Sequence, residues 1–340
     1  MGRQPRAERA QSGERLRKMP AVGFEVCGPD TEAYEILDDR FLLCIKRSAR
    51  VERLYAGCRW AEGPVYVPAG RYLLWSDIPA DRMLRWDEVN GVVGTFRRPA
   101  GHSNGLTLDA EARLVSCEHA GRRVTRTEHD GTLTVLADRF KGKRFNSPND
   151  VVVRSDRSVW FTDPPYGIES DYEGHRAESE LASCNVYRLD PVTRECRIVA
   201  GDFVRPNGLG FSPDERRLYI SDTGASRELD GPRHIRVFDV ANDGLLSNGS
   251  IFATCTKGVH DGFCLDEAGR VWASASDGVH CYDPDGSLIG KVLIPEVVAN
   301  LAFGGPKRNR LFICATTSLY SVFLPVNGAP LPLDSVRRSP

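Results

Sequence analysis

The chain carries one chemical feature six times: a carboxylate or carboxamide side chain stands immediately before a short, largely apolar run. The six residues are Glu62, Asn104, Asn149, Asn207, Asp261 and Asn300. Carboxylate and amide carbonyl oxygens are the ligands that hard divalent cations such as Ca²⁺, Mg²⁺ and Mn²⁺ prefer. Because the set holds two carboxylates and neither cysteine nor histidine, it predicts an all-oxygen site for one such cation.

A second interpretation of these residues is turn chemistry. Asn104, Asn207 and Asp261 each precede a glycine, and Asn-Gly and Asp-Gly are common turn dipeptides. The same argument fits Glu62 poorly, because glutamate is not a favoured turn residue. Glu62 therefore favours the cation site, and the turn interpretation stays open for the others.

Acidic residues also end the second apolar run of three repeats, at Asp77, Asp163 and Asp222. They fit two roles, contact with a ligand or termination of a strand. Asp163 is followed by Pro164 and Pro165, which form a rigid corner that would present Tyr166 to a bound molecule. We therefore expect Asp163 and Tyr166 to contact the substrate.

Two histidines lie close to the oxygen-bearing positions. His102 stands two residues before Asn104, and His119 follows Cys117-Glu118. Either imidazole could hydrogen-bond a ligand or pack in the core. We predict that both contact the substrate, together with Asn104.

The elements that position these residues come from an internal repeat. Its six copies begin at positions 63, 105, 150, 208, 262 and 301, and each holds three or four short apolar runs separated by Gly, Asp and Pro turns without helical periodicity. Four-stranded units of this length are typical of a β-propeller, whereas a β-sandwich would not repeat one template six times. The sequence thus predicts an all-β, six-bladed propeller. The first strands of its blades would bring the six oxygen-bearing residues to one end of a central channel.

The same repeat defines the expected domain organisation. Residues 1–20 form a basic tail that we expect to be disordered, and residues 21–62 a segment that closes the ring. Within it, the stretch 50–55 would supply the outer strand that the last repeat lacks. Residues 63–325 form the propeller and 326–340 a C-terminal tail. The polar insertion 168–184 lies between the second and third strands of its blade, where a lid or subunit contact could form.

Composition excludes several classes of protein. The 340 residues are 41% hydrophobic and 27% charged with a net charge of −1, so neither nucleic acid nor an anionic membrane is an expected partner. No apolar run approaches the roughly 18 residues that span a bilayer. The ten cysteines include no C-x-x-C pair, which favours reduced thiols and a cytoplasmic location.

Several strings resemble the gluconolactonase branch of the regucalcin (senescence marker protein)/gluconolactonase-like family, over roughly residues 35–325. They are the segments 61–64 (AEGP), 146–152 (NSPNDVV), 160–167 (WFTDPPYG), 206–209 (PNGL) and 261–263 (DGF). The resemblance implies a six-bladed propeller with one divalent cation, Ca²⁺ before Mg²⁺, Mn²⁺ or Zn²⁺, that hydrolyses a sugar lactone. It implies Glu62, Asn149, Asn207 and Asp261 as the metal ligands.

The resemblance leaves two of the six positions outside the ligand set. Asn104 would face the substrate, and Asn300 would have no role beyond the turn before its strand. The stretch 101–104 (GHSN) departs from the usual family pattern, so substrate preference is expected to differ.

A mechanism follows from the implied ligand set. The cation would polarise the lactone carbonyl while water attacks its carbon, with Asp261 as the base. Alternatively the cation alone activates the water, and Asp261 is only a ligand. Two other functions stay open: a phosphotriester or aryl-ester hydrolase on the same scaffold, and a non-enzymatic propeller that binds Ca²⁺ or a partner. The chain is expected to act as a monomer or homodimer.

Overall fold

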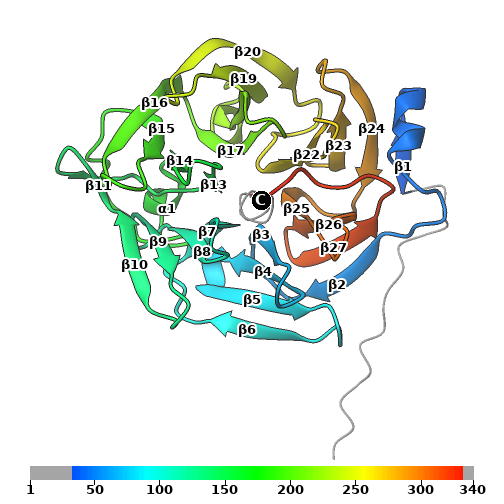
Figure 1. Cartoon of the computed structure of the whole chain (residues 1–340), viewed down its shortest axis with the longest axis horizontal. Coiled ribbons are helices and arrows are strands. Elements are labelled where there is room, and N and C mark those ends of the chain that lie inside the picture. The colour runs from blue at the N-terminus through cyan, green and yellow to red at the C-terminus, as the bar shows by residue number, and fades with distance from the viewer. Residues whose placement is uncertain (1–32, 332–340) are drawn as a thin grey trace, which may run out of the picture.

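The computed structural model describes residues 33–331 and consists of six antiparallel sheets arranged around a central axis (Figure 1). Five sheets have four strands and one has five, and a two-stranded hairpin stands apart. The first strands of adjacent sheets contact one another all the way around the axis. The prediction of an all-β, six-bladed propeller is therefore confirmed. The basic tail predicted for residues 1–20 lies outside the described residues.

Each blade runs outward from the axis in chain order. The first contains β3 (Ala61–Val67), β4 (Tyr72–Asp77), β5 (Arg82–Asp87) and β6 (Val93–Arg97). The second contains β7 (Ser103–Leu108), β8 (Leu114–Glu118), β9 (Arg123–Thr127) and β10 (Leu133–Ala137). The third contains β13 (Val151–Val153), β14 (Val159–Asp163), β15 (Cys184–Leu189) and β16 (Cys196–Phe203).

The second half of the ring repeats this order. The fourth blade contains β17 (Pro206–Phe211), β18 (Arg217–Asp222), β19 (His234–Val240) and β20 (Leu246–Thr254). The fifth contains β21 (Phe263–Leu265), β22 (Val271–Ala275), β23 (Gly278–Tyr282) and β24 (Leu288–Leu293). The sixth contains β25 (Val298–Gly304), β26 (Arg310–Ala315) and β27 (Ser318–Phe323).

Two N-terminal strands complete the last two blades. β2 (Glu52–Ala56) pairs antiparallel with β27 and becomes the outer strand of the sixth blade. β1 (Tyr34–Ile36) pairs with β24 and adds a fifth strand to the fifth blade. Chain segments from both ends of the propeller thus share one sheet, which closes the ring and covers a strand edge that would otherwise be open.

Short elements occupy the connections between strands. β11 (Arg139–Phe140) and β12 (Lys143–Arg144) form the separate hairpin, and α1 (Tyr166–Glu169) follows β14. The 3-10 helices are η1 (Asp39–Leu43), η2 (Ile78–Ala80) and η3 (Gly224–Ser226). None of the helices in residues 33–331 has the length and apolar character needed to cross a membrane.

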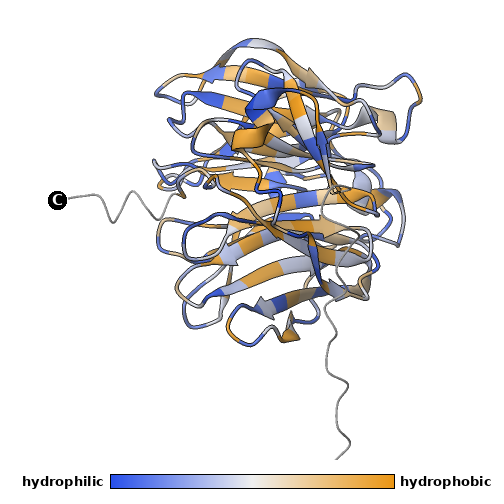
Figure 2. Cartoon of the chain, turned by 90° about the vertical axis from the view of Figure 1, so that its right-hand side faces the viewer, coloured by the Kyte–Doolittle hydropathy of each residue, from blue (hydrophilic) through white to orange (hydrophobic). Residues whose placement is uncertain are grey.

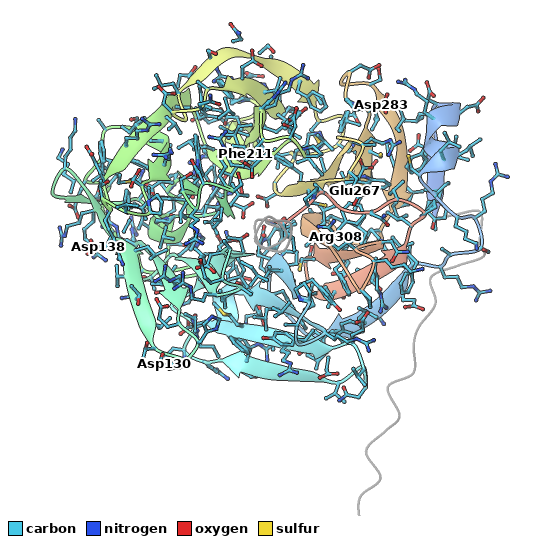
Figure 3. All side chains as sticks on the ribbon, viewed as in Figure 1. Asp130, Asp138, Phe211, Glu267, Asp283 and Arg308 are labelled. Atoms are coloured by element: carbon cyan, nitrogen blue, oxygen red, sulfur yellow. The ribbon has the colours of Figure 1, made fainter. Side chains whose placement is uncertain are left out.

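The core lies between neighbouring blades, where the sheets pack face to face. The second strand of three blades carries a fully buried tryptophan, at Trp75, Trp160 and Trp272. In the side view the strands are rich in hydrophobic residues, and the loops that join them are mostly hydrophilic (Figure 2). Side chains crowd the whole ring, with Phe211 and Arg308 near the axis and Asp130 and Asp138 at the rim (Figure 3). The nine cysteines of the described residues are all free.

Candidate active site

The six oxygen-bearing residues begin the six innermost strands. Glu62, Asn104, Asn207 and Asn300 lie inside β3, β7, β17 and β25, while Asn149 and Asp261 stand two residues before β13 and β21. Five of the six are buried and Asp261 is partly exposed. Glu62 and Asn300 pair with Ser76 and Cys314 of the next strand, whereas Asn104 and Asn207 lie at irregularities in the pairing of their strands. A turn before the strand therefore does not account for these four residues.

Asn300 requires a correction. It was expected only to form the turn before its strand, but it lies in the middle of a strand and its side chain is engaged. Its Oδ1 accepts a hydrogen bond from the Leu301 N–H at 2.8 Å, and its side chain lies close enough to Glu62 and Asp150 to lower the pKa of both carboxyls. Asn300 therefore links the acids of the channel.

The glycines after these residues allow the inner strands to approach closely. The Gly105 N–H donates to the Asn149 carbonyl at 2.8 Å, and the Gly208 N–H donates to the Asp261 carbonyl at 2.9 Å. A Cβ on Gly105 would lie 2.5 Å from Oδ1 of Asp150, closer than real side-chain contacts. The Asn-Gly and Asp-Gly pairs of the sequence therefore reflect backbone packing around the axis.

Hydroxyl groups on the second strands hold the same backbone in place. The Ser76 hydroxyl donates to the Asn104 carbonyl at 2.8 Å and the Thr162 hydroxyl to the Asn207 carbonyl at 2.8 Å. The Ser221 hydroxyl donates to the Asp261 carbonyl at 3.0 Å. Each bond joins one blade to the next, so the backbone of these residues is fixed by neighbouring blades rather than by local turns.

Acidic side chains converge at this end of the channel. The Asp261 carboxyl interacts with the side chains of Glu62 and Asn207. Burial, together with the nearby carboxyls of Glu173 and Asp150, raises the pKa of Asp261 to about 7. Burial, with the Asp261 charge second, holds the pKa of Glu62 well above its usual value. The structure thus places Asp261 next to two of the other three predicted metal ligands, Glu62 and Asn207.

The donor set fits a hard divalent cation. The charged groups that act most strongly on Glu62 and Asp261 are other carboxylates, and no arginine or lysine ion pair to either is found in residues 33–331. Ionised carboxylates buried together are costly unless a cation compensates them. Asn149 precedes Asp150, whose charge acts on both acids, and so lies at the same level of the channel. Glu62, Asn149, Asn207 and Asp261 could together hold one ion through oxygen alone.

Asn104 is oriented by a chain of hydrogen bonds that ends in the insertion 168–184. Its Nδ2 lies 3.4 Å from Nε2 of His119, and Nδ1 of His119 lies 3.0 Å from the Glu173 carbonyl. Burial lowers the pKa of His119 to about 4, so the ring is neutral and Nδ1–H donates to that carbonyl. Nε2 then accepts from the Asn104 amide, which leaves the Asn104 oxygen for another partner. The fully buried His119 ring lies behind Asn104.

His102 lies against the same insertion. It adopts a left-handed backbone conformation with φ of 49°, and its Nδ1 is 2.9 Å from the Ile78 carbonyl. Its ring meets that of His175 edge to face, with centroids 5.6 Å apart. The insertion therefore reaches over the mouth of the channel, touching both histidines that the sequence singled out.

Tyr166 is connected to the predicted ligands through one residue. Its hydroxyl lies 2.7 Å from Oγ1 of Thr223 and 2.8 Å from Oγ of Ser226, and the same Thr223 hydroxyl accepts from the Asn207 amide at 3.3 Å. The guanidinium of Arg205 lies 5.1 Å from the centre of the tyrosine ring. Tyr166 is thus held firmly beside Asn207.

Asp163 serves the backbone of its own blade. It is fully buried, and its Oδ2 accepts from the Asn146 N–H at 2.9 Å. Asp77 and Asp222 do the same for Arg59 and Val204, at 2.8 and 2.9 Å. Each carboxylate braces the loop that leads into the inner strand, and this arrangement supports the strand-end interpretation of the three acids. A contact between Asp163 and substrate stays a prediction.

Comparison with known proteins places this geometry in a family. A family model described as "SMP-30/Gluconolactonase/LRE-like region" matches residues 60–317. The chain belongs to this family. Gluconolactonase of Zymomonas mobilis is 32% identical over 302 residues, which cover 81% of each chain, and pentonolactonase of Haloferax volcanii is 30% identical over 270 residues, which cover 75% of this chain and 81% of its own.

Solved structures agree with the family assignment. A gluconolactonase of Xanthomonas campestris is 37% identical and superposes with a TM-score of 0.83 over 91% of this chain and all of its own. A calcium-binding regucalcin of Agrobacterium tumefaciens, at 19% identity and a TM-score of 0.68, shares the fold, covering 83% of this chain and 96% of its own. The resemblance predicted from the sequence is therefore confirmed.

In this member of the SMP-30/gluconolactonase family, sequence reasoning missed two acids of the channel. Asp150 directly follows Asn149, and burial raises its pKa to about 6. Its position after a predicted ligand was a usable signal. Glu173 comes from the insertion, where nothing in the repeat pattern marked it, yet its charge acts on Asp261. Burial raises its pKa as well.

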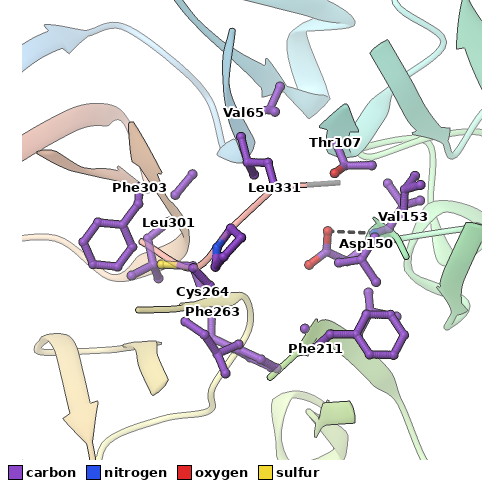
Figure 4. Close-up of a pocket in the computed structure, with 18 of the residues that line it drawn as sticks. Val65, Thr107, Asp150, Val153, Phe211, Phe263, Cys264, Leu301, Phe303 and Leu331 are labelled. Carbon is purple, nitrogen blue, oxygen red and sulfur yellow. Dashed lines mark hydrogen bonds between the residues drawn. The ribbon is translucent and has the colours of Figure 1, made fainter. Parts of the chain in front are cut away.

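A cavity of about 450 Å³ lies along the axis of the propeller (Figure 4). Apolar residues such as Val65, Phe211 and Leu301 line most of it, with Asp150 and Asn300 also in its wall. The C-terminal stretch 329–331 crosses it. Glu62, Asn207 and Asp261 are not among its lining residues, but Asp150 and Asn300 are, so this cavity adjoins the acidic end of the channel.

Proposed function

We propose that this protein opens the ring of a sugar lactone with the help of one divalent cation held by Glu62, Asn149, Asn207 and Asp261. Its family relatives identify it as a lactone-hydrolysing enzyme. The observation that carries the proposed cation is the close approach of two carboxyls, the buried Glu62 and the partly exposed Asp261, whose strongest charged neighbours are themselves acids. Ca²⁺ is our first choice, because mixed carboxylate and amide oxygens suit its flexible coordination.

The polar groups around the acids suit a hydroxylated substrate. Asn104 directs a free amide oxygen away from His119, and Tyr166 and Thr223 present hydroxyls beside Asn207. Groups of this kind hydrogen-bond sugar hydroxyls, whereas an aryl ester would need an apolar or aromatic wall. We therefore propose that Asn104, Tyr166 and His102 contact the substrate and that His119 positions Asn104.

The cation would supply Lewis-acid chemistry, polarising the lactone carbonyl and stabilising the negative charge that develops on its oxygen. Water attacks the carbonyl carbon, and we assign Asp261 to accept the proton that the water loses. The bond between the carbonyl carbon and the ring oxygen then breaks, the ring oxygen takes up the proton that Asp261 holds, and an aldonic acid is released. The interaction of Asp261 with the Asn207 side chain would help to orient its carboxyl.

The insertion 168–184 is our candidate lid. The bond from His119 to its backbone and the contact between His175 and His102 hold it over the channel mouth. Such a lid would limit the entry of bulk water around the bound lactone. A cytoplasmic location and a monomeric or homodimeric state stay predictions from the sequence.

A substrate panel tests this function. Hydrolysis of D-glucono-1,5-lactone, a five-carbon aldonolactone, an aryl ester and a phosphotriester would be compared with Ca²⁺ present. We expect the two sugar lactones to be hydrolysed with the highest kcat/KM. Faster turnover of the aryl ester or phosphotriester would instead support a general ester hydrolase, and no turnover of any substrate would support a binding propeller. Either result would reject the proposed function.

A further inference from the structure

A second cluster of potential metal ligands lies where the fourth blade leads into the fifth and contains sulfur and nitrogen. The Sγ of Cys255 and one ring nitrogen each of His260 and His280 all lie within 4.8 Å of one another. The three residues are 4%, 1% and 0% exposed. None of them belongs to the oxygen-bearing set, although His260 directly precedes Asp261. This cluster is therefore chemically different from the channel site.

Both imidazoles are oriented as metal-binding histidines usually are. Nδ1 of His260 lies 2.7 Å from the Ser274 carbonyl, and Nε2 of His280 lies 2.7 Å from Oδ1 of Asp277. Each ring therefore donates its N–H to an outer oxygen and turns its lone pair inward. Outer-shell acceptors of this kind fix the tautomer and raise the basicity of the ligand nitrogen.

Of the two ring nitrogens that carry these lone pairs, only one has a hydrogen-bond partner. Nδ1 of His280 is buried and has no hydrogen-bond partner in the structure. Nε2 of His260 lies 2.9 Å from the hydroxyl of Tyr282. Burial lowers the pKa of His280, which favours the neutral ring, and the unpartnered Nδ1 of that ring can act as a ligand. An unpartnered nitrogen in the core costs free energy, and a metal ion would offset that cost.

We propose that Cys255, His260 and His280 bind one zinc ion, with Tyr282 or a water molecule as the fourth ligand. A point within about 2.8 Å of three atoms so spaced always exists, and contraction by less than about 1 Å would give the usual Zn–N and Zn–S lengths of about 2.0 and 2.3 Å. Mixed sulfur and nitrogen donors select zinc over the hard cations expected at the channel.

Binding at this site would release a proton. Burial raises the pKa of the Cys255 thiol to about 11, and its S–H donates to the Lys257 carbonyl at 3.2 Å. A coordinating thiol loses its proton outright, so Zn²⁺ uptake converts the thiol to a thiolate and frees one H⁺. The ion would tie the loop before Asp261 to β23 and so limit movement of the channel carboxylate.

Cobalt tests the site without any substrate. The full-length protein would be stripped of metal with a chelator and titrated with Co²⁺ while its absorption spectrum is recorded. We expect one equivalent to produce a thiolate-to-cobalt charge-transfer band, which Zn²⁺ then abolishes by displacement. The channel site has only oxygen ligands, so Co²⁺ bound there cannot give this band. Absence of the band in the wild-type protein would overturn the proposal.

Four variants locate the signal. Cys255→Ser and His280→Gln should each remove the band or weaken Co²⁺ binding by at least about tenfold. Cys264→Ser changes another cysteine of the same blade and should leave the band intact. Glu62→Gln, which impairs the channel site, should also leave it intact, so failure of the proposed lactonase function would not affect this result. A band that survives in both Cys255→Ser and His280→Gln would refute the assignment.

Discussion

The carboxyl groups of Glu62 and Asp261 lie close enough at the end of the channel to interact directly, although they begin the inner strands of blades that are not neighbours. Two carboxyls this close are most stable when one of them keeps its proton, in agreement with the raised pKa of both. A bound divalent cation would replace that proton. The pair is thus the point where proton and cation binding compete.

Neutralising either Glu62 or Asp261 should separate the contribution of the pair to cation binding from its effect on stability. In Asp261→Asn and Glu62→Gln, we expect cation affinity to fall by at least about 100-fold, because one of two charged ligands is lost. In the presence of chelator the same variants should be at least as stable as the wild type, because a buried charge is removed. Calorimetric titration with Ca²⁺ and thermal unfolding would measure both quantities.

Glu178→Gln is the matched control for these substitutions. Glu178 is an exposed acid of the insertion, so its loss changes the net charge equally without touching the channel. An equal loss of Ca²⁺ affinity in this control would mean that overall charge, and not the Glu62–Asp261 pair, determines binding.

His119→Phe tests the orientation of Asn104. The substitution removes the acceptor for the Asn104 amide and the donor to the Glu173 carbonyl while keeping a ring in the core. We expect KM for the lactone to rise about tenfold, the cost of roughly one hydrogen bond to a misdirected amide, with a smaller change in kcat. Steady-state kinetics would measure the changes in KM and kcat separately. His129→Phe, at an exposed histidine, should have no effect, and an unchanged KM in His119→Phe would contradict the positioning role.

Gly105→Ala tests the close packing of the inner strands. The new Cβ would lie 2.5 Å from Asp150 Oδ1 and 2.7 Å from the Asn149 carbonyl. Overpacking of this kind should lower the free energy of unfolding by about 1–3 kcal/mol and weaken cation binding. Gly94→Ala is the control, because Gly94 is also a strand glycine but has no atom within 4 Å of its Cβ position. Denaturant unfolding should show no destabilisation in Gly94→Ala, and equal losses in both variants would exclude the packing explanation.

The buried Asp163 predicts a pH dependence of stability. Burial raises its pKa to about 7 from 3.8, so its contribution is complete near pH 4 and is lost as pH rises through 7. The loss is at most about 4 kcal/mol, at about 1.4 kcal/mol per pH unit. Asp163→Asn keeps an acceptor for the Asn146 N–H and removes this ionisation. We expect the variant to gain stability relative to the wild type between about pH 5 and 8 in denaturant unfolding; a constant difference across that range would contradict the assignment.

The repeat made the architecture predictable, because each blade repeats the same pattern of apolar runs and turns. The same alignment brought Glu62, Asn207 and Asp261 to one end of the channel, where the structure places Asp261 next to the other two. Asn300 was misjudged because a strand residue and a turn residue look alike before an apolar run. Glu173 was missed because it reaches the channel from an insertion that follows no repeat, so only the three-dimensional path of the loop reveals it.

The most direct test of the central claim is acid release from D-glucono-1,5-lactone near pH 6.5, where spontaneous opening is slow enough to subtract. The rate would be compared for wild-type protein in excess chelator, for the same protein after Ca²⁺, Mg²⁺, Mn²⁺ or Zn²⁺ is restored, and for Asp261→Ala with metal. We predict that chelation abolishes the activity, that a divalent cation restores it and that Asp261→Ala remains inactive. Full lactonase activity in chelator, or in Asp261→Ala, would contradict a channel cation held by these acids.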